Sequence, residues 1–180
     1  MKMLALLRGI NVGGNRKVSM SELQSVAVEI GFTKVETYIN SGNLVFESRK
    51  LSAAKASEQL EKAIEKHFGF PVDVIVRTAK QWNTYASENP FPKAADSRPN
   101  LLMIGLPKLP LAKNTFEILS ERSAKNEQIK IVNDVIWVDF ANGSGKSKLT
   151  PLWFEKASGS PVTLRNWRTL LKLEEILAGQ

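Results

Sequence analysis

The chain has 180 residues, of which 43% are apolar, and it carries a formal net charge of +7. This length fits one ordinary domain or two small ones, and the apolar fraction excludes an intrinsically disordered chain. No apolar run reaches the roughly 18 residues that span a bilayer, and the absence of cysteine excludes disulfides and thiolate metal sites. These features predict a cytoplasmic globular protein without a membrane segment.

The first half of the chain is predicted to alternate strands and helices around one β-hairpin. Ser19 and Glu22 form a capping box at a helix start, and Gly31 is a typical helix stop. The segment 40–43, Asn-Ser-Gly-Asn, is typical of a tight turn between two strands. The predicted elements are strands at 3–7, 34–39, 44–47 and 72–77, helices at 19–30 and 52–68, and a short helix at 78–88.

The second half repeats this pattern of elements, although the two halves share almost no residue identity. Pro151 stands where proline is favoured, in the first turn of a helix that ends near Gly159. The predicted elements are strands at 100–106, 128–132, 135–140 and 161–164, and helices at 114–123, 150–158 and 166–178. The segment 89–99 contains three prolines and is predicted to be a linker.

The order strand, helix, hairpin, helix, strand predicts a fold of the α+β class. We expect two ferredoxin-like (split βαβ) halves, each with an antiparallel or mixed sheet and with helices packed on one face. The predicted boundaries are 1–88 for the first half, 89–99 for the linker and 100–180 for the second half. The two halves can also form one compact unit.

The basic excess is concentrated in two segments that lie far apart in the sequence. Residues 1–17 contain four basic side chains and no acidic one, and residues 141–172 contain six basic side chains and one acidic one. Residues 18–140 are balanced, with 15 of each sign. If folding brings the two segments together, they form a basic cleft that attracts anions. The alternative is that these side chains are only solvated.

The first basic segment contains a glycine loop, LLRGINVGGNR at 6–16. Its spacing matches neither the dinucleotide fingerprint nor a P-loop, but exposed backbone N–H groups beside Arg8 suit an anion. A second glycine loop at 142–148 contains Gly-Lys-Ser, but the P-loop position five residues before Gly145 is Phe140, so an ATPase is not expected. For both loops, a purely structural turn is the alternative.

Two further segments carry polar side chains suited to a ligand. The turn at 40–43 offers amides and a hydroxyl if it lies near the first loop, and otherwise it is only a turn. The segment 163–169 combines Arg165, Asn166 and Trp167 at a helix start, where an indole can stack on a base or belong to the core. The candidate ligand-binding residues are Arg8, Asn11, Gly13, Gly14, Asn40, Ser41, Asn43, Lys146, Ser147, Lys148, Arg165, Asn166 and Trp167.

The motifs LLRGINVGGN (6–15), TYINSGNLVF (37–46), GSGKSKLT (143–150) and RNWRTLLKL (165–173) resemble a bacterial family known as domain of unknown function 1697. The resemblance extends from Met3 to about Leu173. It implies a small cytoplasmic α+β protein of two ferredoxin-like halves and supplies no catalytic residues. The chain departs from the family pattern at Lys146 and Arg168, where other residues are common.

The leading hypothesis is a binding module for a phosphorylated small molecule or a nucleic acid. We expect the two glycine loops to face each other across a basic cleft that holds this ligand, and Arg8 to point into the cleft. The first alternative is an enzyme acting on a phosphorylated or nucleotide substrate, with Asp139 as the nearest candidate carboxylate. The second is a scaffold without a ligand. We expect no metal and no cofactor, because the only histidine is His67. The sequence does not decide the oligomeric state and favours a monomer.

Overall fold

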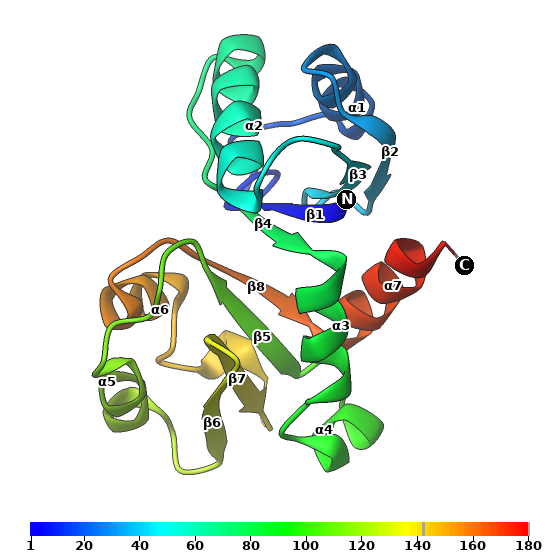
Figure 1. The fold of residues 1–180 in the computed structure, drawn as a ribbon. Coiled ribbons are helices and arrows are strands. Elements are labelled where there is room, and N and C mark those ends of the chain that lie inside the picture. The colour runs from blue at the N-terminus through cyan, green and yellow to red at the C-terminus, as the bar shows by residue number, and fades with distance from the viewer. Residues whose placement is uncertain (142, 180) are drawn as a thin grey trace. The chain divides into compact units, whose positions relative to one another are not determined.

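The computed structural model describes residues 1–141 and 143–179, which form two compact units (Figure 1). The first unit comprises Met1–Asn83 and Leu173–Gln180, and the second comprises Thr84–Lys172. Each unit combines helices with a four-stranded antiparallel sheet, which confirms the predicted α+β class. Within the described residues, no helix has both the length and the apolar character needed to cross a bilayer.

The sheet of the first unit has the order β2-β3-β1-β4. The strands β1 and β2 are joined through α1 but separated by β3, so the β-α-β connection is split. Figure 1 shows α1 and α2 on the same face of this sheet. The elements are β1 (Lys2–Leu7), α1 (Met20–Glu29), β2 (Thr33–Tyr38), β3 (Asn43–Glu47), α2 (Ala53–Phe68) and β4 (Val74–Thr78).

The core of the first unit follows from strand and helix periodicity. Met3, Ala5 and Leu7 are alternate residues of β1 and therefore project to one face, where they pack with Leu23 of α1 and Leu60 of α2. Ser19 caps α1 by accepting from the backbone of Glu22, as the capping box predicts. The amphipathic helices α1 and α2 thus turn their apolar side chains toward this face of the sheet.

The second unit has a sheet with the corresponding order β6-β7-β5-β8. Its helices α5 and α6 lie side by side and share a core with β7 and β8 (Figure 1). The elements are α4 (Pro92–Ser97), β5 (Leu102–Pro107), α5 (Thr115–Arg122), β6 (Glu127–Val132), β7 (Val135–Phe140), a short 3₁₀ helix (Ser144–Lys146), α6 (Pro151–Ser158) and β8 (Val162–Asn166).

The structure places the boundaries between the units differently from the sequence-based ones. The helices α3 (Ala79–Ser87) and α7 (Trp167–Ala178) each span a boundary, and residues 173–179 group with the first unit. The segment 89–99 contains α4, with Phe91 and Ala94 buried, rather than an extended linker. Pro92 starts this helix because proline fits the first helical turn, where its missing N–H is not needed.

Candidate functional site

The first glycine loop forms a tight hairpin within the first unit. Gly13 and Gly14 have φ of +59° and +80°, as the central residues of a type I′ turn do. The N–H of Asn15 donates to the carbonyl of Val12 at 3.2 Å, and the N–H of Asn11 donates to the carbonyl of Arg16 at 3.1 Å. The glycines therefore have a structural role, since other residues are strained at these angles.

Asn11 fastens this hairpin to the turn at 40–43. Its Nδ2 donates to the carbonyl oxygens of Val18 at 3.0 Å and of Asn40 at 2.8 Å, and its Oδ1 accepts from the N–H of Val18 at 2.9 Å. The structure thus brings the first loop beside the turn at 40–43. This proximity is what a ligand site shared by the two segments requires. Asn11 adopts φ of +54°, a conformation that asparagine tolerates better than most residues.

We expect Asn11→Ala to destabilise the protein by about 2 kcal/mol, because it removes three hydrogen bonds of an exposed side chain and places alanine at positive φ. Urea unfolding of the variant measures this loss. Asn11→Gly avoids the strain of alanine at positive φ and should therefore recover part of the lost free energy of unfolding. Asn15→Ala, in the same hairpin, should remain within about 0.5 kcal/mol of wild type. Equal stability of the alanine variants would contradict the tethering role of Asn11.

A cavity of about 530 Å³ lies where the hairpin, the turn and the start of α1 meet. We call it the Asn11 cavity; its lining residues are Asn11, Gly14, Lys17, Val18, Ser19, Met20 and Asn40. Among the described residues, Lys17 has no ion-pair partner and the Asn40 carboxamide makes no hydrogen bond. The start of α1 adds the partial positive charge of a helix N-terminus. These groups together can hold an anion.

Arg8 lines a different cavity from Asn11. Its Nη1 lies 3.4 Å from Oδ2 of Asp73, and its backbone N–H donates to the carbonyl of Asp73 at 3.0 Å. This second cavity, of about 250 Å³, also contains Arg16, Glu61 and Glu65. With three carboxylates beside two guanidinium groups, it is less suited to an anion than the sequence suggested for Arg8.

The other polar residues of the turn hold its backbone in place. Asn43 is fully buried, and its Nδ2 donates to the carbonyl of Tyr38 at 2.9 Å and to Oγ of Ser41 at 3.0 Å. The structural interpretation of these two residues is therefore favoured over ligand recognition. Of the residues of the turn, Asn40 lines the Asn11 cavity.

The second glycine loop folds as a short 3₁₀ helix in the second unit. Ser147 Oγ accepts from the N–H of Leu149 at 2.9 Å, so this hydroxyl is occupied. Lys146 and Lys148 are exposed and have no ion-pair partner among the residues that the structure describes. Asn142 of this loop lies outside the described residues. Whether the two glycine loops serve one ligand stays a prediction.

The three candidates at the start of α7 are used within the protein. Arg165 is 7% exposed, donates to Oγ1 of Thr163 at 2.7 Å, and burial lowers the pKa of its guanidinium to about 10. Asn166 Oδ1 accepts from the N–H of Thr169 at 2.8 Å, as a helix cap does. The ring of Trp167 lies 5.9 Å from that of Trp137, which favours the core interpretation.

Asp139 is held by Arg98 in the second unit. Arg98 donates from Nε to Oδ1 at 2.9 Å and from Nη2 to Oδ2 at 2.5 Å, and these bonds raise the pKa of Arg98. Because both carboxylate oxygens are occupied, Asp139 is poorly placed to accept a proton from a substrate. Within residues 1–141 and 143–179, no three His, Asp or Glu side chains are grouped closely enough to hold a metal ion.

Sequence reasoning did not single out Lys17, Ser19 and Met20 as residues of a site. The signal was available, because a capping box directly after two basic residues marks a helix N-terminus that can meet an anion. The missing information was which side of α1 the turn at 40–43 would occupy.

The geometry of the first unit can be compared with that of known proteins. A family model described as "Protein of unknown function (DUF1697)" matches residues 1–137. The chain belongs to this family. The matched region includes the hairpin, the turn and the start of α1, and it ends before the second glycine loop.

A solved structure supports the same fold. The conserved bacterial protein SP0830 from Streptococcus pneumoniae is 27% identical, with a TM-score of 0.75 and coverage of 98% of each chain. None of the curated proteins matches the chain.

Proposed function

We propose that this protein is a binding module for a phosphorylated ligand, a nucleotide or a nucleic-acid segment, held at the Asn11 cavity. The observation that carries the proposal is the meeting of three groups in one cavity: the ammonium group of Lys17, the start of α1 and the carboxamide of Asn40. Neither side chain has a partner within residues 1–141 and 143–179. A phosphate offers several acceptor oxygens and a negative charge, which these donors complement.

The surroundings of the cavity favour a nucleotide over inorganic phosphate. Val12 and Ile39, on the two loops that form the site, are 69% and 49% exposed. Exposed apolar side chains next in sequence to the lining residues Asn11 and Asn40 offer contact area to a base or a sugar. Arg16 adds a second cation nearby, in the neighbouring cavity.

Strained backbone is also concentrated here. Asn11, Arg16 and Ile39 are three of the non-glycine residues with positive φ in the described chain. Such conformations cost free energy and are common at binding sites, where they position donors.

The enzymatic alternative needs a carboxylate or lysine poised for chemistry, and its sequence candidate, Asp139, is engaged by Arg98. We therefore propose binding rather than catalysis. The cytoplasmic location and the monomeric state remain predictions.

Binding of ATP and of a short labelled RNA of mixed sequence, measured over a salt series, tests the proposal. Lys17→Ala should weaken binding of both probes roughly tenfold and lower the salt slope for RNA by about one unit, because one phosphate contact is lost. The matched control is Lys62→Ala, which removes the same charge from the exposed side of α2 and should bind like wild type. If the two variants bind equally, or if wild type binds neither probe, the proposal is wrong.

A further inference from the structure

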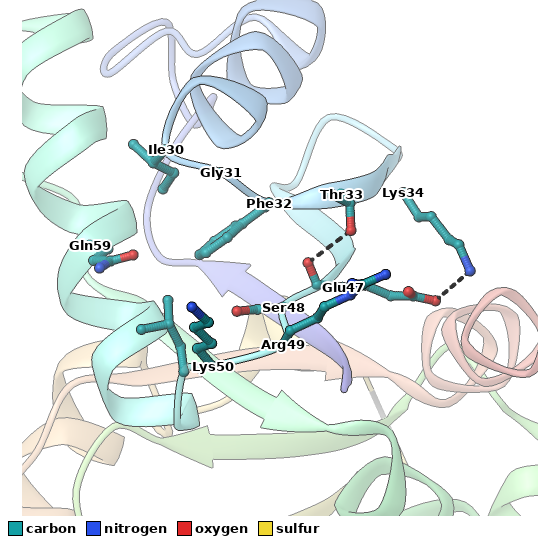
Figure 2. Close-up of a pocket in the computed structure, with 11 residues that line it drawn as sticks. Ile30, Gly31, Phe32, Thr33, Lys34, Glu47, Ser48, Arg49, Lys50 and Gln59 are labelled. Atoms are coloured by element: carbon teal, nitrogen blue, oxygen red, sulfur yellow. Dashed lines mark hydrogen bonds and ion pairs between the residues drawn. The ribbon is translucent and has the colours of Figure 1, made fainter.

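A third cavity of the first unit, of about 560 Å³, lies between the end of α1, the open end of the β2–β3 hairpin at Thr33 and Glu47, and the first half of α2. We call it the Phe32 cavity (Figure 2). Its apolar lining residues include Ile30, Phe32 and Leu51, and its polar ones include Ser48, Lys50 and Gln59. It shares no lining residue with the Asn11 cavity, and its volume is that of a small-molecule site.

The apolar side of the cavity is rigid. The ring of Phe32 is stacked on that of Phe46, with centroids 4.2 Å apart and planes within 8° of parallel. Phe32 is 2% exposed and belongs to the core of the unit, so it cannot easily turn away. Phe32 therefore fixes the inner wall of the cavity, and the half-buried Ile30 and Leu51 supply the apolar surface that a ligand can contact.

Ser48 supplies the observation that points to a ligand. The residue is 8% exposed, yet its hydroxyl makes no hydrogen bond among the described residues. Figure 2 shows the hydroxyl turned into the space beside Phe32, Lys50 and Gln59. The hydroxyl oxygen is accessible from the cavity, so it is available to a bound molecule as a donor and an acceptor.

The charge of the cavity is positive. Lys50 and Arg49 are exposed and have no ion-pair partner in the described part of the chain. Glu47, the carboxylate of the lining, lies 3.0 Å from Nζ of Lys34, and that hydrogen bond lowers the pKa of Glu47. Because Lys34 balances Glu47, the positive charge of Lys50 is left for a ligand.

We propose that the Phe32 cavity is a second site, independent of the proposed nucleotide site, for a small organic anion. The apolar or aromatic body of this molecule packs against the half-buried side chains of Ile30 and Leu51, and its carboxylate or phosphate group accepts hydrogen bonds from Lys50, Ser48 and Gln59. This geometry distinguishes the ligand from inorganic anions, which have no apolar body, and from neutral aromatic molecules, which have no charge for Lys50.

Amide chemical-shift titration of the full chain tests the proposal with phenyl phosphate and benzoate as probes, and with inorganic phosphate and benzyl alcohol as comparisons. Saturable shifts are expected at residues 30–34 and 47–51 with phenyl phosphate, benzoate or both, and the stronger of the two identifies the anionic group. Lys50→Ala should weaken the binding roughly tenfold. The matched control is Lys55→Ala, which removes a charge from the exposed first turn of α2 and should bind like wild type.

Ser48→Ala separates ligand binding from folding. The hydroxyl has no protein partner, so its removal should leave the melting temperature unchanged or raise it, while binding of the anionic probe weakens several-fold. The proposal is overturned if neither anionic probe gives saturable shifts at millimolar concentration, or if Lys50→Ala binds as wild type does. It is also overturned if inorganic phosphate or benzyl alcohol binds as tightly as the anionic aromatic probes.

Discussion

Replacing Gly42 with alanine is expected to destabilise the protein by about 3–5 kcal/mol, because the new methyl group meets both a steric and a conformational barrier. Gly42 has φ of +76°, and a Cβ there would lie 2.7 Å from Cβ of Leu7 and from Cδ1 of Ile10. The backbone cannot easily move away, since the N–H of Leu7 donates to the carbonyl of Gly42 at 2.8 Å. Urea unfolding, with the slope checked for constancy, measures the loss.

Gly14 offers a matched control in the neighbouring hairpin. It has φ of +80°, nearly the same conformation, but a Cβ there would have no atom within 4 Å. Gly14→Ala should therefore show the conformational cost alone, about 1–2 kcal/mol. The difference between the two variants isolates the close contact of the turn with β1. If the two variants lose the same stability, the packing of Gly42 against Leu7 and Ile10 is not as described.

Arg98→Met is expected to lower the melting temperature by roughly 5–10 °C, because Asp139 would then be a buried carboxylate without a cation. Asp139 is 2% exposed, and Arg98 bonds both of its oxygens. Thermal unfolding followed by circular dichroism measures the shift. Lys93→Met, on the helix α4 that directly precedes Arg98, removes a charge from an exposed position and should change the melting temperature little.

A double variant distinguishes a buried charge from lost packing of the arginine. Arg98→Met combined with Asp139→Leu removes both charges and should regain most of the lost melting temperature, because a buried ion pair can be replaced by apolar groups at little cost. If the change in melting temperature of the double variant equals the sum of the changes in Arg98→Met and Asp139→Leu, the two residues do not act as a pair.

Much of the fold follows from local sequence patterns. Three local signals set elements of the first unit close to their observed bounds: the capping box at Ser19, the glycine stops at Gly31 and Gly69, and the continuous apolar run of β1. In the second unit, Asn133 and Asp134 both adopt positive φ in the predicted tight turn. These signals are readable because each depends on residues within a few positions of one another.

The boundaries of the units, in contrast, do not follow from local sequence patterns. The prolines of 89–99 suggest a linker, whereas Pro92 begins a helix. The end of α7 belongs to the first unit, where the carbonyl of Ile176 accepts from Nζ of Lys2 at 2.7 Å. This contact joins residues 174 positions apart, and no local periodicity records it.

The glycine hairpin at the start of the chain illustrates both what the local sequence determines and what only tertiary packing decides. Its polar residues, its positive charge and its two glycines are plain in the sequence, and they suggest an anion site with a turn as the alternative. Only the tertiary structure decides that the glycines form the turn, that Arg8 lies beside Asp73, and that Asn11 reaches Asn40 to enclose a cavity with Lys17. The reason is physical: residue types set which interactions are available, and long-range packing decides which of them are made.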